Sequence, residues 1–431
     1  MNYIKTFDPS ILLGDRLGIT LYCMLVRAYL LGDYSKEIKM YKKFINNFPR
    51  EVDTHTPENF FKLIENIKNN GFDLSTPIYA NPNEFTLLDG AHRSAIAIQL
   101  GIKDVPYSLR FQDDRTDDSV LHRVFGDKGF ELLQQKRDEY ISLCEPLIAL
   151  KCRIRMHMRE NSESFQAPFS SQTKIPSLRL YQSLEKLDIP GKRLSQRRVE
   201  TYELARYLSN SMRVMEVGCN VGFLSLAIAD YVHSIDAFDI DQNYITIAEY
   251  VQEFCNNNNC RFFVQSLSEF VPIYQYDFVI STAVHGWSAL PFEEYVSILT
   301  KHIKPGGLLF FESHELDAEK NWPDKRALLT NNYDLIGQGF IDDVDDRMYQ
   351  SEIREFLILR KRLGVDYGNL RLQNTRVACD NLSAEEKHPN LPATRQISQI
   401  ARNLARLIFR STNSSAARIV VQKVFRNSSR K

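Results

Sequence analysis

Apolar runs of strand length alternate with stretches of helical period between about residues 177 and 362. Helices are recognised by apolar residues three or four positions apart, and strands by short runs of β-branched and aromatic residues. Their alternation predicts an α/β fold, a doubly wound, Rossmann-like parallel sheet with helices on both faces. The predicted strands are Arg213–Val217, Ser234–Asp239, Arg261–Gln265, Asp277–Thr282, Gly307–Glu312 and Glu355–Arg360.

The N-terminal part has a different pattern, which predicts a smaller α+β domain over residues 1–112. Two short strands flank the turn at residues 81–84, and Asp89-Gly-Ala-His-Arg93 opens a helix that Gly101 ends. Thr56 and Pro57 begin an earlier helix. The apolar segment 19–31 is too short for a membrane span and carries Arg27, so it predicts a buried helix.

The remaining regions are a connector and a tail. Residues 113–176 are charged and of helical period, and they end in a polar, turn-rich linker at 160–168, so we expect a helical connector there. Residues 363–431 form a C-terminal extension. From residue 392 onward it carries nine Lys or Arg and no acid, with Ile397, Ile400, Leu404, Leu407 and Ile408 in a helical stripe. A basic amphipathic helix suits peripheral contact with an anionic membrane surface. The alternative is a solvated end.

The composition narrows the function classes. The 431 residues include 54 Lys+Arg and 54 Asp+Glu, so no overall charge attracts nucleic acid, and we expect none as a partner. The N-terminus lacks the pattern of a signal peptide, which predicts a cytoplasmic protein. The seven cysteines lack the spacing of a zinc site, and we expect no metal.

A glycine turn follows the first predicted strand of the large domain. Gly218 and Gly222 bring backbone N–H groups to a helix N-terminus, a general site for ligands. The dinucleotide pattern G-x-G-x-x-G fits poorly, because residue 220 is Asn and residue 225 is Ser. Asp239, about 20 residues later, suits a ribose diol.

These residues resemble those of the class I S-adenosylmethionine-dependent methyltransferases over about residues 177–362. The matching segments are Glu216–Gly222, Asp239, Asp277–Ser281 and Lys304–Gly307. The resemblance implies that Asp239 holds the ribose of the cofactor, with Ile240 and Ser266 near the adenine. Many members have an acid where this chain has Ser266. The residues that the resemblance places around the rest of S-adenosylmethionine are Glu216, Gly218, Cys219, Asn220, Gly222 and Phe223.

The segment before the glycine turn, at residues 180–183 and 191–202, looks like that of a subgroup acting on surface glycans and related small molecules. Arg193, Arg197 or Arg198 is a candidate to pair with the cofactor carboxylate. The alternative is a set of solvated charges on a helix.

Methyl transfer to a hydroxyl benefits from a base. The candidates follow the fourth and fifth predicted strands: His285, His314 and Glu312. A histidine suits this role at neutral pH. The alternative for His285 is a loop residue that packs against Trp287. Trp287 is either a wall of the acceptor site or plain packing.

Residues 54–111 resemble the ParB/sulfiredoxin-like superfamily, in which a Gly-x-His-Arg-type turn meets nucleotide phosphates. Asp89, Gly90, His92 and Arg93 match that turn. No cysteine lies near it, which argues against thiol repair, and we find no helix-turn-helix for DNA partitioning. A small-molecule kinase or a nucleotide-sensing module is left, with ATP as a candidate ligand. The alternative is a structural helix start.

The two resemblances together predict a methyltransferase that O-methylates a small molecule or glycan, with a first domain that phosphorylates the acceptor or senses a nucleotide. This arrangement is similar to bifunctional kinase–methyltransferases of surface polysaccharide synthesis. A nucleotide-binding regulatory protein with an inactive methyltransferase domain is the alternative. A nucleic-acid methyltransferase is disfavoured, because residues 281–286 lack the Asn/Asp-Pro-Pro-aromatic loop that methylates base amino groups.

Overall fold

The computed structural model describes residues 5–47, 56–73, 75–81, 86–108, 118–165, 178–316, 318–319, 321–344, 352–365 and 367–370. The chain divides into two units. One comprises Met1–Lys192 with Asp241–Asn257, and the other comprises Arg193–Ile240 with Asn258–Lys431. The predicted basic tail lies outside the described residues.

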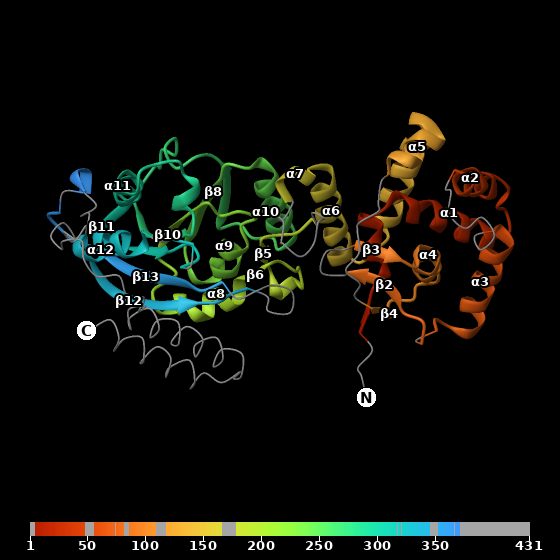
Figure 1. Ribbon diagram of the computed structural model, residues 1–431, viewed down its shortest axis with the longest axis horizontal. Coiled ribbons are helices and arrows are strands. Elements are labelled where there is room, and N and C mark those ends of the chain that lie inside the picture. The colour runs from red at the N-terminus through yellow and green to blue at the C-terminus, as the bar shows by residue number, and fades with distance from the viewer. Residues whose placement is uncertain are drawn as a thin grey trace, which may run out of the picture. The chain divides into compact units, whose positions relative to one another are not determined.

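The first unit combines a small sheet with several helices (Figure 1). The sheet has the order β1-β4-β2-β3, with strands Thr6–Phe7, Val105–Ser108, Ile78–Asn81 and Thr86–Asp89. The other elements are η1 (Pro9–Gly14), α1 (Leu17–Leu31), α2 (Ser35–Ile45), α3 (Pro57–Asn70), α4 (Ala91–Leu100), α5 (Ser119–Ser142), α6 (Pro146–Glu160), α7 (Ser162–Phe165), β5 (Gln182–Ser183), η2 (Glu185–Leu187) and α10 (Gln242–Phe254).

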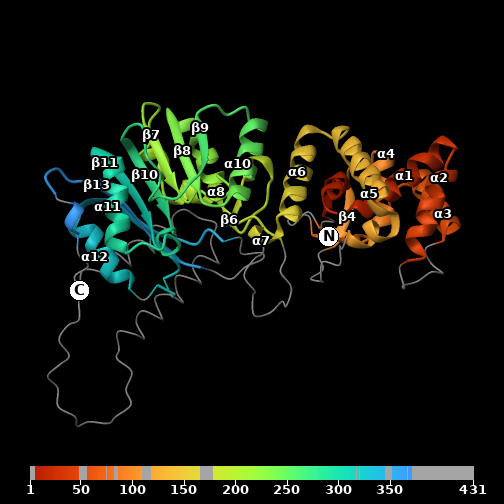
Figure 2. The same cartoon turned by 90° about the horizontal axis from the view of Figure 1, so that it is seen from above.

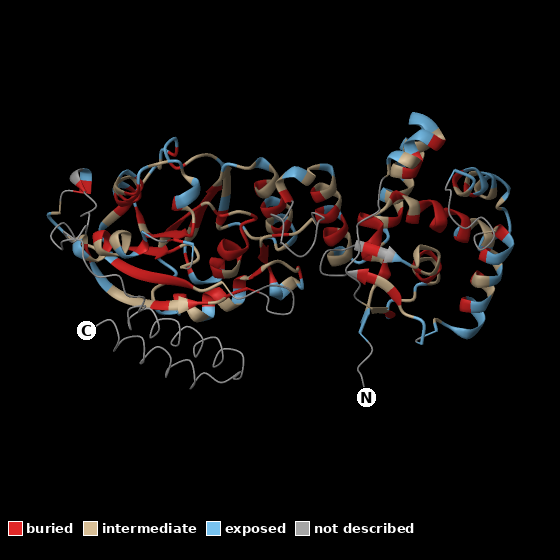
Figure 3. Cartoon of the chain, viewed as in Figure 1, coloured by how far each residue is buried: buried red, intermediate tan, exposed pale blue. Residues whose placement is uncertain are grey.

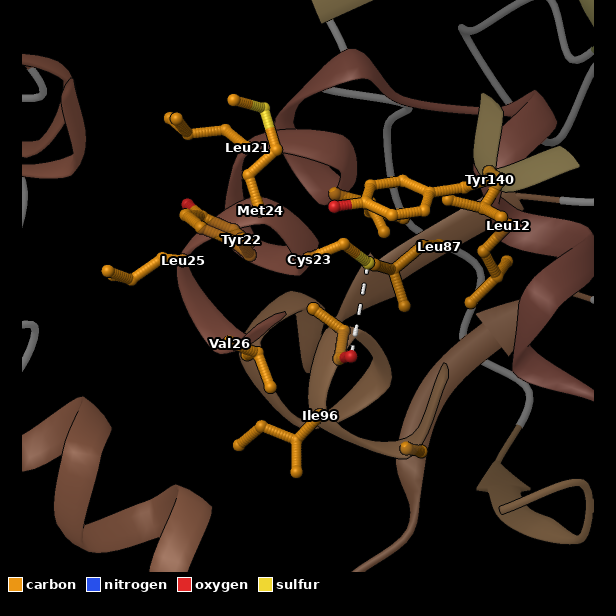
Figure 4. Packing of buried hydrophobic residues seen from close by; sticks show 14 of the residues in the cluster. Leu12, Leu21, Tyr22, Cys23, Met24, Leu25, Val26, Leu87, Ile96 and Tyr140 are labelled. Atoms are coloured by element: carbon orange, nitrogen blue, oxygen red, sulfur yellow. Dashed lines mark hydrogen bonds between the residues drawn. The ribbon is translucent and has the colours of Figure 1, made fainter. Parts of the chain in front are cut away.

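Local sequence explains where these helices begin and end. The hydroxyl of Thr56 accepts the backbone N–H of Asn59 at 3.2 Å and caps α3, as predicted. Gly101 ends α4 in the left-handed conformation. Helix α1 is buried along much of its length, and Cys23 lies in the middle of the core (Figure 4). Among the described residues, no helix combines the length and hydropathy that a membrane crossing needs.

A buried carboxylate ties the predicted connector to the first unit. Asp15, at the end of η1, pairs with Arg155 and Arg159 of α6 at 3.0 Å and accepts the N–H of Leu87 at the same distance. Burial opposes ionisation, but the two arginines outweigh it and lower the pKa of Asp15. The described part of residues 113–176 therefore belongs to this unit, and the boundary lies at Lys192/Arg193.

The second unit contains a seven-stranded sheet of order β12-β13-β11-β10-β7-β8-β9. The strands from β11 to β9 follow one another in this order in Figure 2. The strands are β7 (Arg213–Val217), β8 (Ser234–Asp239), β9 (Cys260–Val264), β10 (Tyr276–Thr282), β11 (Ile303–Glu312), β12 (Tyr333–Ile341) and β13 (Arg354–Lys361). The other elements are β6 (Arg193–Leu194), α8 (Ser195–Thr201), η3 (Leu204–Arg206), α9 (Phe223–Ile228), η4 (Ala229–Tyr231), η5 (His285–Trp287), α11 (Phe292–His302), α12 (Trp322–Asn332) and η6 (Tyr367–Asn369).

The prediction of an all-parallel sheet was wrong at one edge. Strand β13 runs antiparallel to both β11 and β12, and β12 was not predicted. The five strands from β7 to β11 are parallel, as expected.

Side-chain alternation places helices on both faces of the sheet. Phe311 packs against Phe292 of α11 and Trp322 of α12, with ring centroids 5.6 and 6.1 Å away. Its neighbour Phe310 faces the other way and packs on Tyr202, just after α8, at 4.5 Å. Strands β10 and β13 are accordingly buried along most of their length (Figure 3). The doubly wound prediction is confirmed for this unit.

Candidate active site

The strand order locates the edge where a ligand would bind. From β7 the chain steps to β8 and then β9, whereas β10 pairs with β7 on its other side. In open sheets of this kind, ligands bind at the carboxyl ends of the strands where the order reverses. The loops after β7, β8, β10 and β11 therefore define the candidate site.

The glycine turn after β7 is tightly packed at Gly218. Gly218 has a φ of +65°, and a Cβ atom there would lie 2.6 Å from Cγ2 of Val284. Asn220 and Gly222 also have positive φ values, of 52° and 69°. The N–H of Asn220 donates to Oδ2 of Asp239 at 2.9 Å, so the end of β8 holds the turn. The turn thus contacts both neighbouring loops.

Two buried acceptors of this turn lack donors. Glu216 is fully buried, and one of its oxygens accepts the hydroxyl of Ser225. Its Oε1 and the Oδ1 of Asn220 have no hydrogen-bond partner among the described residues. Burial raises the pKa of Glu216 to about 7, although Ser225 and Arg198 oppose the shift. Buried polar atoms are normally satisfied, so this pair favours a ligand that brings N–H donors or positive charge.

The other predicted cofactor residues are distributed as follows. Cys219 and Phe223 are buried, and Phe223 begins α9. Ile240 is 71% exposed directly after Asp239, an unusual position for a large apolar side chain. In the turn after β9, the hydroxyl of Ser266 donates to the carboxylate of Glu269 at 2.7 Å.

Two of the three candidate arginines belong to a buried ion cluster. Arg193 pairs with Asp343 and Glu352, and Arg198 pairs with Asp343 at 3.1 Å and Glu312 at 3.4 Å. Each guanidinium already binds protein carboxylates.

Arg197 is different from its two neighbours. It is half-buried and has no hydrogen-bond or ion-pair partner among the described residues. Of the three arginines, it is the one left to meet a ligand carboxylate.

Glu312 belongs to the same cluster, which favours a structural role over the predicted catalytic one. Its Oε1 accepts from Arg354 at 2.8 Å, and its Oε2 accepts from Arg198 and from the hydroxyl of Tyr202. Burial alone would raise the pKa of Glu312, but the two arginines outweigh it and lower the pKa. Both oxygens accept hydrogen bonds from protein groups and the residue is fully buried, which is unfavourable for a base that must meet a substrate.

His285 lies at the centre of a buried network after β10. Its Nε2 is 2.6 Å from Oε1 of Glu319 and 2.9 Å from Nζ of Lys325, and those two atoms are 2.8 Å apart. Its Nδ1 is buried and has no partner among the described residues. Burial lowers the pKa of His285, Glu319 raises it and Lys325 lowers it again, with a net decrease. The imidazole is therefore neutral at pH 7.

His314 supports the loop that carries His285. Its ring Nε2 accepts the backbone N–H of Gly286 at 3.0 Å. The backbone N–H of His314 donates to Oε2 of Glu319 at 2.8 Å. Burial, followed by the neighbouring His285, lowers the pKa of His314 to about 4. These contacts favour a structural role and leave His285 as the stronger candidate for a base.

The loop between β10 and α11 is strained at both ends. Ala283 and Ala289 have φ values of 53° and 56°, which non-glycine residues rarely adopt. Such strain often occurs at functional sites. Within this loop His285 is buried, whereas Trp287 is 81% exposed. The predicted packing of His285 against Trp287 is not among its described ring contacts, which are with Phe292, Tyr295, Phe311 and His314.

Residues 192–344 match a family model described as a methyltransferase domain. The match covers β6 to the end of β12, and it includes the glycine turn and the His285 loop. The methyltransferase resemblance of this region is therefore confirmed. The acceptor is not specified by the match.

Several solved structures are similar to part of the chain. The N-methyltransferase NodS from Bradyrhizobium japonicum is 15% identical with a TM-score of 0.33, covering 38% of this chain and 96% of that one. A methyltransferase from Methanosarcina mazei is 16% identical (TM-score 0.31, 37% and 97% covered). One from Geobacter sulfurreducens with S-adenosyl-L-homocysteine is 14% identical (TM-score 0.32, 38% and 90% covered). No curated protein matches the chain. Similarity at this level does not transfer a substrate.

The predicted nucleotide turn of the first unit has its side chains engaged with protein. Arg93 donates to the carbonyl oxygens of Thr76 and Pro77. His92 bonds the hydroxyl of Tyr41 at 3.0 Å and stacks on Tyr22 at 4.3 Å between ring centroids.

The start of this turn is also tied to protein. Asp89 accepts the N–H of Gly90 at 2.6 Å, and a Cβ at Gly90 would meet Ile78. The resemblance to ParB/sulfiredoxin-like domains stays a prediction.

Sequence patterns missed Glu319 and Lys325. They lie 34 and 40 positions after His285, in a polar segment without a recognisable motif. That Nδ1 of His285 has no hydrogen-bond partner among the described residues follows only from the three-dimensional contacts.

Proposed function

We propose that the methyltransferase domain binds S-adenosylmethionine at the Gly218–Gly222 turn and methylates a hydroxyl group of a small molecule or glycan. One observation carries the proposal. The residue before His285, Val284, contacts the glycine turn, while Nδ1 of His285 is buried and unpaired among the described residues. His285, the proposed proton acceptor, therefore directly follows the residue that contacts the proposed cofactor turn, Val284.

The residues of the turn fit the amino-acid end of this cofactor. Glu216 Oε1 and Asn220 Oδ1 are buried acceptors suited to an ammonium group, and Arg197 suits a carboxylate. Asp239 is our candidate for the ribose hydroxyls, and the exposed Ile240 is our candidate to cover the adenine. When bound, S-adenosylmethionine supplies an electrophilic methyl group on a sulfonium.

The chain's own contribution is alignment and proton removal. A neutral His285 accepts the proton that the hydroxyl loses as its oxygen gains the methyl group. His285 is 5% exposed, so competing water is largely excluded from it. Trp287, exposed on the same loop, offers a flat apolar wall for the ring of an acceptor.

For the first unit, we propose nucleotide binding at Asp89–Arg93, either to phosphorylate the acceptor or to sense the nucleotide. The support is the left-handed Gly90 that opens α4, because helix N-termini attract phosphate. Since Arg93 donates to two carbonyl groups, a phosphate would meet backbone N–H groups rather than the guanidinium.

Two measurements test the methyltransferase proposal. Calorimetric titration with S-adenosylmethionine and S-adenosylhomocysteine should show one site per chain. Incubation with labelled S-adenosylmethionine and fractionated extract of the source organism should then label a non-protein, non-nucleic-acid product, with mass spectrometry locating the methyl on oxygen.

Different outcomes separate the alternatives. No cofactor binding at millimolar concentration would sink the proposal and favour a regulatory protein with an inactive domain. A labelled nitrogen would keep the cofactor site and reject the hydroxyl. Titration with ATP tests the first unit independently, and the absence of heat would reject its nucleotide role.

A further inference from the structure

The network behind His285 contains two residues to which no role has been given, Glu319 and Lys325. Both touch Nε2 of His285, the ring nitrogen opposite the unpaired Nδ1. The two nitrogens of a neutral imidazole are chemically distinct, since one carries the proton and the other a lone pair. Which nitrogen carries the proton decides whether His285 can act as a base.

Of the two partners of Nε2, the nearer one decides its protonation: Oε1 of Glu319 at 2.6 Å calls for a proton on Nε2, whereas Nζ of Lys325 at 2.9 Å would suit a lone pair. Burial alone would raise the pKa of Glu319, but hydrogen bonds from His285 and Lys325 outweigh it and lower the pKa to about 2. Glu319 is therefore a carboxylate, which only accepts, and Nζ of Lys325 donates to its Oε1 at 2.8 Å. A bare Nε2 would hold its lone pair 2.6 Å from a carboxylate oxygen. A protonated Nε2 makes a charge-assisted hydrogen bond at that distance.

Protonation of both nitrogens is also disfavoured. It would place an N–H with no described acceptor, on a cation, in a buried position. Lys325 adds a second positive charge 2.9 Å from the ring. The remaining state is a neutral imidazole with the proton on Nε2 and the lone pair on Nδ1.

Lys325 and His314 complete the coordination of Glu319. Lys325 donates to Oε1 at 2.8 Å, and the backbone N–H of His314 donates to Oε2 at 2.8 Å. Both oxygens are thereby held, and the carboxylate cannot rotate away from the imidazole. The described groups around this network leave one buried polar atom unsatisfied, Nδ1 of His285.

We propose that Glu319 and Lys325 are positioning residues that fix His285 in the tautomer with the proton on Nε2, so that Nδ1 receives the proton of the methyl acceptor. Glu319 orients the ring, and Lys325 holds Glu319 and keeps the resting imidazole uncharged. The assignment of a base rests on the proposed function, but the tautomer does not.

The test begins with the tautomer of His285 in the full chain. The protein is labelled with 15N-histidine, and long-range 1H–15N spectra are assigned by comparison with His285→Gln. The expected spectrum has a protonated Nε2 and an unprotonated Nδ1 at pH 7.5. A wild-type spectrum with the proton on Nδ1 overturns the proposal without any acceptor or cofactor.

Two variants should shift the pKa of His285 in opposite directions. The charged or titratable groups around it in the described structure are Glu319, Lys325, His314 and Tyr295. Lys325→Met removes a cation, so the pKa of His285 should rise, and Lys325→Arg should restore it. Glu319→Gln removes an anion, so the pKa should fall and the two tautomers should mix. Shifts in the same direction would contradict the proposal.

The last part of the test measures the rate of methyl transfer to the acceptor fraction that methyl labelling has identified. Glu319→Gln should lower kcat by at least about 10²-fold, the lower end of what a positioned base contributes, with the Kd for S-adenosylmethionine within about twofold of wild type. Glu294→Gln and Lys301→Met, exposed on α11, are the matched controls. An unchanged kcat would refute the positioning role. Loss of cofactor binding in the wild type would refute the proposed function and leave the tautomer result standing.

Discussion

Two glycine turns in this chain share a strand–turn–helix setting and differ in what their side chains do. Each follows a strand and opens a helix: Gly218–Gly222 leads into α9, and Gly90 leads into α4. At the first turn, two buried acceptors lack partners among the described residues: Glu216 Oε1 at the end of β7 and Asn220 Oδ1 in the turn itself. In the turn after β3, the side chains of His92 and Arg93 bond protein groups.

The difference teaches that a turn motif alone marks a helix start, whereas buried acceptors without donors beside such a turn favour a ligand. Leaving a buried acceptor unpaired costs about 1–3 kcal/mol, so a fold rarely keeps two together without a purpose. The first turn keeps unpaired buried acceptors and bears this free-energy cost, whereas the side chains of His92 and Arg93 at the second turn are paired with protein groups. Predictions about the two turns should therefore diverge.

The largest effect is expected from His285, the proposed base. His285→Ala should lower the methyl-transfer rate by about 10²- to 10⁴-fold, because a positioned base contributes that much. Cofactor affinity, measured by calorimetry, should stay near that of the wild type. His233→Ala, at an exposed histidine after η4, is the control. A wild-type rate in His285→Ala would transfer the role of base to another group.

Loss of cofactor binding is the next largest effect. Gly218→Arg should weaken the binding of S-adenosylmethionine by about 10²-fold or more. At 1.4 kcal/mol for each factor of ten, this is a loss of about 2.8 kcal/mol of binding free energy. Even a Cβ there meets Val284 at 2.6 Å. The circular dichroism spectrum verifies that the sheet survives. A folded variant with retained affinity would move the cofactor away from this turn.

The stability of the fold should depend on pH through Glu216, which precedes the first turn. Its pKa is raised from 4.5 to about 7, so the folded chain binds this proton more tightly than the unfolded chain does. The stability that it contributes is complete below pH 4.5 and is lost as the pH rises to 7, by about 3 kcal/mol for 2.5 pKa units.

Glu216→Gln should therefore raise the free energy of unfolding at pH 8 and leave it almost unchanged at pH 4.5. Both tryptophans, Trp287 and Trp322, lie in the second unit, so urea unfolding followed by their fluorescence reports that unit alone. The variant should also bind S-adenosylmethionine more weakly. Equal stabilisation at both pH values would contradict the assigned pKa.

The smallest effect is expected at the second turn. Arg93→Met removes hydrogen bonds to two carbonyl groups and should cost about 1 kcal/mol of stability. Because the first unit has no tryptophan, circular dichroism should register the change while the fluorescence transition stays in place. If Arg93→Met instead abolished ATP binding without loss of stability, the guanidinium would be a ligand and the contrast between the turns would fail.

Sequence patterns predicted the parallel strands well. Strands β7 and β8 have the predicted bounds, and β9 and β10 begin one residue early. Apolar runs carry this signal because both faces of the sheet are covered. Strand β12 escaped prediction because Asp334, Gly337, Gln338 and Gly339 interrupt its apolar pattern. At the sheet edge, fewer side chains need to be apolar.

The predicted site was less complete for a physical reason. The glycine turn is local, so its residues could be read in order. The partners of His285 and of the buried arginines are far away in the chain; Arg193, for example, meets Asp343 at a separation of 150 residues. Local periodicity holds no information about such pairs. It therefore left Arg193 and Arg198 as candidates for the cofactor carboxylate.

The buried ion cluster also sets a minimum length for a folded fragment. Arg193, Arg198 and Arg354 balance Glu312, Asp343 and Glu352. Truncation at residue 344, where the family match ends, would delete Arg354, Glu352 and the whole of β13. Strand β11 would lose its antiparallel neighbour and Glu312 one of its two arginines. Any autonomous version of this domain must therefore extend through Lys361.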